Sequence, residues 1–189
     1  FETNDEKTDR KTLYKIYDEN DRLIKSVDFK GYTTTYLYED SDRPDDMTRS
    51  YTYLPGEDAP ITATYYGRVN NNTITTIQNE TIQVNANQGA LLAAKQVDLR
   101  VKDPSATSLH RETIYTSYDV ENKLTQSKDY KDYYTNYYYD EDTDDMALSA
   151  TFKQKPNIPA FGSMPTPDEL KQQDAVSATY YDRRFDNVL

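Results

Sequence analysis

The chain has 189 residues, enough for one large β domain or two small ones, each with its own apolar core. Its 33 acidic and 22 basic residues give a formal net charge of -11, which disfavours nucleic acid and anionic membranes as partners. The absence of cysteine excludes disulfides and thiolate chemistry, and no apolar stretch is long enough for membrane insertion.

Tyrosine is the unusual feature of the composition. Leucine, isoleucine, valine and phenylalanine are scarce, which together with the high net charge is typical of disordered chains. The 19 tyrosines change this interpretation, because each ring can bury an apolar face while its hydroxyl finds a polar partner. Tyrosine and threonine also favour strands. The composition therefore predicts an all-β protein with a core built largely from phenol rings.

The first part of the chain is predicted to be a β-meander. Residues 1–11 are mostly charged and are expected to form a flexible tail. In residues 12–85, short runs of β-branched and aromatic residues alternate with Asn, Asp and Gly, which is the pattern of strands joined by turns. We expect about five strands and then a further strand pair. The expected strands are 13–17, 22–29, 32–38, 48–54 and 61–69, followed by 73–77 and 81–84.

Residues 86–112 are predicted to be a connector, with a short helix at 89–95, a strand at 97–101 and a loop at 103–105. Residues 113–189 are predicted to form a second β-meander that carries an inserted loop, 153–175. The insertion contains four prolines, and Thr166-Pro167-Asp168-Glu169-Leu170 is a helix-start signal, with a capping hydroxyl, a proline at the first helical position and acids near the positive dipole end.

The two meanders are copies of one unit. The run that begins at Thr12 aligns with the run that begins at Thr113, at an offset of 101 residues. The offset falls to 99 at Asp45 and rises to 115 at Ile61. Between these two matching blocks the second copy therefore carries 16 more residues than the first. The duplication predicts two homologous antiparallel meanders of about five strands each, which form a barrel or a sandwich with internal pseudo-symmetry.

One hairpin in each copy resembles a known repeat. The first copy has Tyr17-Asp18, Arg22-Leu23, Gly31 and Tyr36-x-Tyr38-Glu39, and the second has Tyr118-Asp119, Lys123-Leu124 and Tyr137-x-Tyr139-Asp140. This pattern resembles the YD-type repeat of bacterial Rhs and related toxin-shell proteins. It departs from that repeat at Asp21 and Asn122, where the repeat usually has glycine. The resemblance implies a β-hairpin with tyrosine on one face and a location outside the cell.

Tyrosines on the third strand of each copy are the candidate ligand-binding residues. Tyr36 and Tyr137 lie on the face that keeps tyrosine in both copies, which predicts a shared core face or, in a closed barrel, the lining of a cavity. The opposite face of the second copy carries Tyr134, Asn136 and Tyr138. We expect this face to contact a ligand, unless a second layer covers it. Phe161 in the inserted loop completes the candidate set.

An acidic turn follows each of these strands. Asp140, Asp142 and Asp144 alternate along the second copy, and alternating carboxylates are ligands that Ca²⁺ accepts. The alternative is a solvated hairpin turn. Apart from this calcium hypothesis, the sequence predicts no cofactor.

The motifs of several enzyme classes are missing. His110 is the one imidazole, and it lies in a charged connector, so neither a serine triad nor a zinc site is expected. The chain has no glycine-rich phosphate loop. The sequence leaves open a hydrolase that uses a pair of carboxylates to cleave glycosidic bonds, because acidic residues are plentiful.

We therefore expect a non-catalytic, secreted or cell-surface binding or adhesion module. Its ligand is a glycan, a protein or a small molecule. The alternatives are a soluble carrier with a tyrosine-lined barrel cavity and a glycan-active hydrolase.

Overall fold

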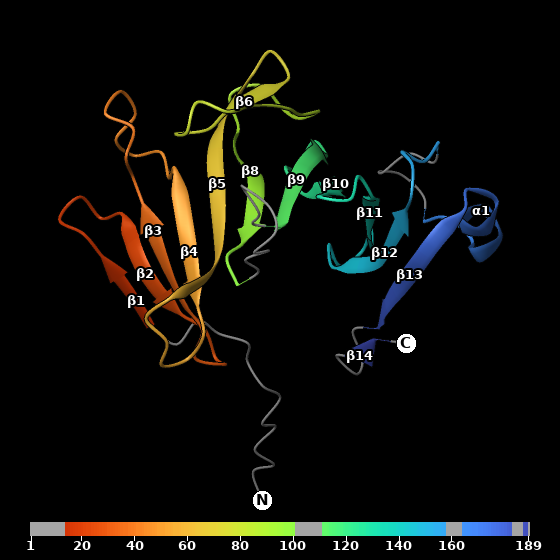
Figure 1. Ribbon diagram of the computed structural model, residues 1–189, viewed down its shortest axis with the longest axis horizontal. Helices are drawn as coiled ribbons and strands as arrows, with labels where there is room; N and C mark the ends of the chain where they lie inside the picture. Colours follow the sequence, from red (N-terminus) through yellow and green to blue (C-terminus); the bar gives the residue numbers. More distant parts are fainter. Residues whose placement is uncertain (1–13, 101–110, 158–163, 183–186, 189) are drawn as a thin grey trace, which may run out of the picture.

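The computed structural model describes residues 14–100, 111–157, 164–182 and 187–188. Within these residues the fold is all-β, as predicted, with one antiparallel sheet of fourteen strands and a single short helix (Figure 1). The predicted tail, 1–11, lies outside the described residues. The elements are β1 Tyr14–Tyr17, β2 Leu23–Val27, β3 Thr33–Leu37, β4 Arg49–Tyr53, β5 Pro60–Asn70, β6 Thr73–Thr75, β7 Thr81–Gln83, β8 Leu91–Asp98, β9 Arg111–Tyr118, β10 Leu124–Asp129, β11 Tyr134–Tyr139, β12 Met146–Phe152, α1 Pro167–Gln172, β13 Ala175–Asp182 and β14 Asn187–Val188.

The sheet is open. Its strand order is β1-β2-β3-β4-β5-β8-β9-β10-β11-β12-β13-β14, and the β6–β7 hairpin branches from β5. Among the described strands, β1 and β14 are the two ends of this order and do not pair with each other. The sheet is therefore not closed into a barrel, and the meanders do not pack as two separate sheets. This corrects the predicted barrel or sandwich.

Strand β8 explains why the two copies share one sheet. It pairs with β5, where Ala63 lies opposite Val97, and with β9, where Lys95 lies opposite Ile114. Residues 89–95 were expected to form a helix because leucine and alanine favour one. Their place between two open sheet edges overrides this preference, because a strand there satisfies the backbone hydrogen bonds of both neighbours. The connector thus joins β1–β5 and β9–β13, five strands in each copy, edge to edge.

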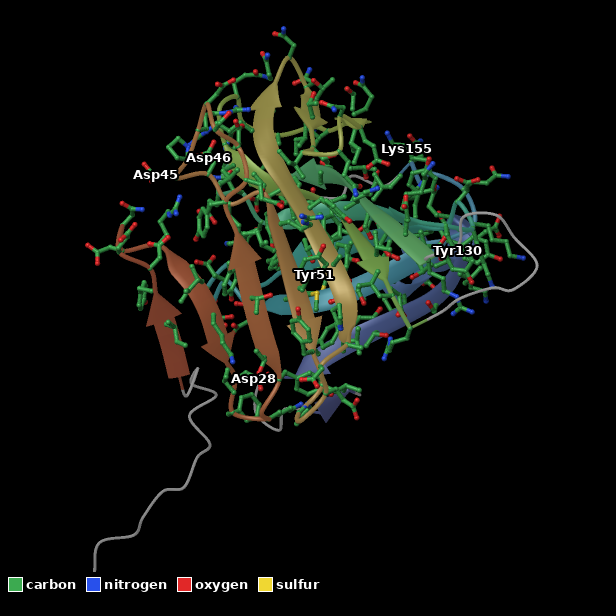
Figure 2. All side chains as sticks on the ribbon, turned by 60° about the vertical axis from the view of Figure 1, so that its left-hand side comes forward. Asp28, Asp45, Asp46, Tyr51, Tyr130 and Lys155 are labelled. Atoms are coloured by element: carbon green, nitrogen blue, oxygen red, sulfur yellow. The ribbon has the colours of Figure 1, made fainter. Side chains whose placement is uncertain are left out.

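The hairpin turns repeat in both copies. Asp18 Oδ1 accepts hydrogen bonds from the backbone N–H groups of Asn20 and Arg22, both at 2.9 Å. Asp119 Oδ1 accepts the equivalent bonds at 2.9 Å. Asp21 and Asn122, which occupy the usual glycine position, have φ values of 60° and 66°, a conformation that Asn and Asp tolerate. The next turn begins at Asp28, at the opposite end of the sheet from Asp45 and Asp46 (Figure 2).

Three clusters of buried side chains hold the sheet. The β6–β7 hairpin packs Ile74 and Ile82 against Leu92 and Ala94 of β8. The inserted segment packs Leu170 of α1 against the second copy, where it meets a group that comprises Tyr138, Leu148, Ala150 and Phe152. A third, smaller cluster contains Ala63, Tyr65 and Val97. No helix in the described part of the chain has the length and apolar character needed to span a membrane.

Lys95 is a buried cation in β8 with a side chain only 4% exposed. Its ammonium pairs with Glu80, lies 3.4 Å from Glu112 and sits 5.1 Å from the centre of the Tyr65 ring. Burial opposes the charge, but the hydrogen bond with Glu80 and the nearby carboxylates outweigh it, so the pKa of Lys95 is raised and the lysine stays charged.

We expect Lys95→Ala to lower the free energy of unfolding by about 1–2 kcal/mol, because it removes the apolar stem that packs beside Tyr65. The loss of stability stays modest because the carboxylates of Glu80 and Glu112 are partly exposed, at 46% and 43%, and do not become buried unpaired charges. Lys95→Met keeps the stem and should stay within about 1 kcal/mol of the unmodified protein. Urea denaturation followed by circular dichroism measures both values, and equal losses in the two variants contradict this account.

Candidate functional site

A row of tyrosines crosses one face of the sheet, on every second strand. The intervening strands carry small residues on the same face. Some of these lie directly opposite a tyrosine, as Ser50 does opposite Tyr36, and others lie diagonally, as Ser26 does, which is opposite Thr34. We call this row the phenol row. Its tyrosines are Tyr36 in β3, Tyr66 in β5, Tyr115 in β9, Tyr137 in β11 and Tyr181 in β13, and the small residues are Ser26, Ser50, Ala94, Ser127 and Ser149.

Serine-to-tyrosine hydrogen bonds fix the row, and they repeat in both copies. The hydroxyls of Ser26 and Tyr36 are 2.9 Å apart, and those of Ser127 and Tyr137 are also 2.9 Å apart. The two remaining pairs, Ser50 with Tyr66 and Ser149 with Tyr181, are both 3.3 Å apart. In each pair the tyrosine leans toward the preceding strand, so its ring lies along the sheet.

In the middle of the row, two tyrosines lie on either side of a buried alanine. Ala94 of β8 is fully buried, and Tyr66 and Tyr115 flank it on the neighbouring strands. Burial, with the nearby phenols of Tyr137 and Tyr66, raises the pKa of Tyr115 to about 12. Burial also raises the pKa of Tyr66 and Tyr137. These phenols in the middle of the row are therefore neutral at physiological pH.

The expected ligand face of the second copy is covered. Tyr138 is 2% exposed in the cluster that contains Leu170 of α1, and Asn136 is 0% exposed. Asn136 accepts a hydrogen bond from Gln126 at 2.8 Å and donates one to the Tyr138 hydroxyl at 3.2 Å. These two residues were expected to face a ligand, and the structure corrects this, because the inserted segment covers Tyr138 through Leu170 and Asn136 is fully buried. Tyr134 is half-buried on the same strand, and Phe161 lies outside the described residues.

Carboxylates of the acidic turn are engaged in hydrogen bonds and an ion pair within the protein. Asp140 Oδ1 accepts hydrogen bonds from the backbone N–H of Asp142 at 3.0 Å and of Thr143 at 2.9 Å. Asp144 Oδ1 lies 2.7 Å from the Lys123 ammonium. Within the described residues, no group of three or more acidic or histidine side chains is arranged to hold a metal ion. The calcium hypothesis for Asp140, Asp142 and Asp144 thus finds no support in this geometry.

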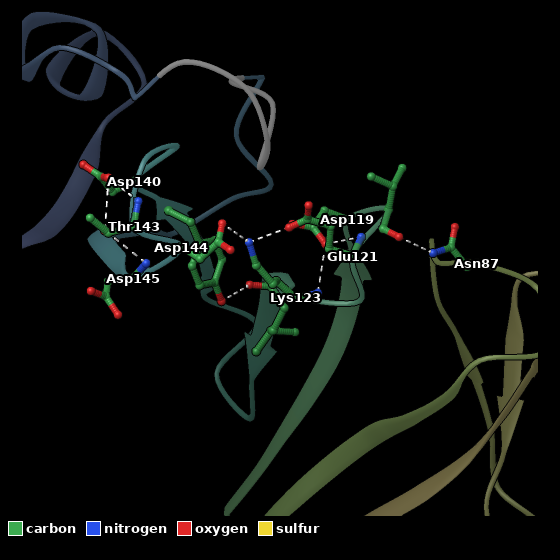
Figure 3. Close-up of polar contacts among 11 residues, drawn as sticks. Asn87, Asp119, Glu121, Lys123, Asp140, Thr143, Asp144 and Asp145 are labelled. Carbon is green, nitrogen blue, oxygen red and sulfur yellow. Dashed lines mark hydrogen bonds and ion pairs between the residues drawn. The ribbon is translucent and has the colours of Figure 1, made fainter. Parts of the chain in front are cut away.

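A pocket of about 260 Å³ lies between this turn and the turn that follows β9 (Figure 3). Lys123, one of the residues that line it, bridges Glu121 at 2.6 Å and Asp144 at 2.7 Å. These ion pairs raise the pKa of Lys123. Next to the pocket, Asn87 of the connector donates to the Val120 carbonyl at 2.8 Å. The residues that line it are Asp119, Glu121, Lys123, Thr125, Tyr137, Tyr138, Tyr139, Asp140, Glu141 and Asp144.

Comparison with known proteins assigns no family. No protein-family model matches the chain, and neither does any curated protein. The crystal structures of TcdB2-TccC3-TEV and TcdB2-TccC3-Cdc42 are similar at 13% and 14% sequence identity, with TM-scores of 0.28 and 0.26. Each alignment covers 93% of this chain and 10% of the other, so the chain spans about a tenth of the length of the structures that it matches. This is a weak structural resemblance, and values this low establish no function.

Sequence reasoning named Tyr36 and Tyr137 but missed the serines that orient them and the pocket beside Lys123. One signal for the serines was available, because both Ser26 and Ser50 recur in the second copy. A signal for the pocket also existed, since Ile24 of the first copy becomes Thr125 in the second. The meeting of two acidic turns around that position follows from the hairpin register, which the sequence pattern does not specify.

Proposed function

We propose that this chain is a non-catalytic binding module, secreted or displayed on a cell surface, that contacts an extended glycan through the phenol row. The observation that carries the proposal is the alternation of tyrosine and a small residue across ten consecutive strands of the sheet. Neighbouring strands lie about 4.8 Å apart, so tyrosines on alternate strands are separated by about 9–10 Å measured across the strands. A periodic surface of this kind suits a polymer with a repeating unit.

The chemistry of the row supports a sugar ligand. A phenol ring that lies along the sheet offers an aromatic face to the apolar side of a sugar ring. The serine and tyrosine hydroxyls next to each ring can both donate and accept hydrogen bonds, as sugar hydroxyls do. The open sheet also favours an extended ligand over an enclosed one. The alternative of a carrier with a barrel cavity loses its premise, because the described strands do not close.

The test measures binding to soluble β-linked hexasaccharides of glucose, xylose and N-acetylglucosamine by isothermal titration calorimetry. We expect at least one of them to bind. Tyr36→Ala and Tyr181→Ala, at the two ends of the row, are then each expected to weaken binding at least about tenfold, because they truncate aromatic anchors.

Tyr130→Ala is the matched control, because Tyr130 is 47% exposed and lies in a turn outside the row (Figure 2). It should leave the affinity unchanged. Thermal unfolding followed by circular dichroism shows whether each variant is folded. The proposal fails if no hexasaccharide binds, or if folded Tyr36→Ala and Tyr181→Ala variants bind as tightly as the control.

A further inference from the structure

The pocket of the second copy has a strong charge imbalance. Five carboxylates and one ammonium line it, in a chain whose net charge is already -11. Two of these carboxylates, Asp119 and Asp140, each use one oxygen to accept backbone N–H groups of their own turns. The other three, Glu121, Glu141 and Asp144, lie in exposed parts of the turns. The pocket therefore attracts a cation.

Lys123 shows what kind of cation fits this geometry. Its ammonium lies between Glu121 and Asp144 and 5.7 Å from the centre of the Tyr139 ring (Figure 3). Two carboxylates and an aromatic face form a suitable environment for an alkylammonium group. Both carboxylates are well exposed, at 61% and 70%, so the exchange of one ammonium for another costs little.

A buried hydroxyl in the lining points independently to a ligand. Thr125 is 1% exposed and lines the pocket, and among the described residues its Oγ1 has no hydrogen-bond partner. A buried hydroxyl without a partner is unfavourable, and a bound donor would relieve that cost. An ammonium carries three donors, so it can donate to one hydroxyl and two carboxylates at the same time.

The first copy shows that the hairpin does not need this arrangement. There Arg22 occupies the place of Lys123, and it is held by Asp18 at 2.7 Å and by the carbonyl of Pro44. Ile24 occupies the place of Thr125, so no hydroxyl is present. Both copies form the same turn at Asp18 and Asp119, while the acidic turn of the second copy is two residues shorter, and the ammonium, the acidic lining and the buried hydroxyl occur together in the second copy.

We propose that this pocket binds an alkylammonium cation of the diamine or polyamine class. At about 260 Å³ it is smaller than the usual site for a drug-sized ligand, and its size suits one end of a short aliphatic amine. One ammonium of the ligand shares Asp144 and Glu121 with Lys123 and donates to Thr125. The carbon chain then lies against Tyr139. The pocket shares Tyr137 with the phenol row, but the proposed cation contacts with Asp144, Glu121 and Thr125 lie outside the row and do not require glycan binding.

The experiment titrates the full chain with putrescine at low salt, by calorimetry and by amide chemical shifts. Putrescine is expected to bind and to shift the amide signals of 119–125 and 140–145. We expect Asp144→Asn to weaken binding at least tenfold and Thr125→Val to weaken it several-fold. Lys123→Met is expected to tighten binding, because it removes the competing internal ammonium. A purely structural role for Lys123 predicts no such gain.

Asp45→Asn is the matched control, because Asp45 is the first-copy equivalent of Asp144. It should leave the affinity unchanged. The proposal is overturned if putrescine does not bind, if Asp45→Asn and Asp144→Asn weaken binding equally, or if Lys123→Met does not tighten it. A parallel titration with CaCl₂ distinguishes a metal site, and tight calcium binding that displaces putrescine also overturns the proposal.

Discussion

Phe152→Ala is expected to lower the free energy of unfolding by about 3–5 kcal/mol. Phe152 is 1% exposed and packs in the cluster that contains Leu148, Ala150 and Leu170. Alanine at this position removes a ring from the contact between the second meander and α1, and it leaves a cavity that the rigid sheet cannot close. Urea denaturation followed by circular dichroism gives the difference.

This variant also tests how the insertion is held. Leu170 contributes the buried side chain of α1, so the loss of Phe152 should expose amides of residues 167–172 to faster hydrogen exchange. Val176→Ala is the control, because Val176 is 45% exposed on the neighbouring strand β13 and should change stability by less than about 0.5 kcal/mol. Equal losses in the two variants show that α1 does not cover a core at this position.

Gly67→Val is expected to lower the free energy of unfolding by about 3 kcal/mol, because β5 has no room for a side chain at this position. A Cβ atom there would lie 2.7 Å from Ile74 Cγ2 and 2.7 Å from the Thr75 carbonyl oxygen. The isoleucine can adjust, but the carbonyl belongs to the backbone of β6, so the whole hairpin must shift. That hairpin supplies Ile74 and Ile82 to the first core cluster.

The measurement for Gly67→Val is again denaturation, with amide shifts of residues 73–83 as the local readout. Thr62→Val, on the same strand but at a half-buried position away from the hairpin, is the control and should cost less than about 1 kcal/mol. If Gly67→Val keeps full stability and unchanged shifts in 73–83, the β6–β7 hairpin does not pack against β5 as described.

The candidate site was predictable only in part. Tyr36 and Tyr137 stand out because the duplication keeps both, and the structure places both in the phenol row. The prediction that Tyr138 faces a ligand was wrong, because strand alternation tells which residues share a face but does not tell what covers that face. The pocket beside Lys123 was missed, because it forms where two turns meet that are separated by about twenty residues of chain.

The sequence by itself determined the duplication, the strand-and-turn pattern and the hairpin turns, because these depend on alternation and on short-range bonds such as those of Asp18 and Asp119 to their own backbone. Only the tertiary structure decided that residues 91–98 form a strand, that the sheet stays open, and that α1 covers Tyr138. These features depend on which edges and faces come together over long separations. Pairing of β8 with β5 and β9 outweighs a local helix preference that is worth less than about 1 kcal/mol per residue.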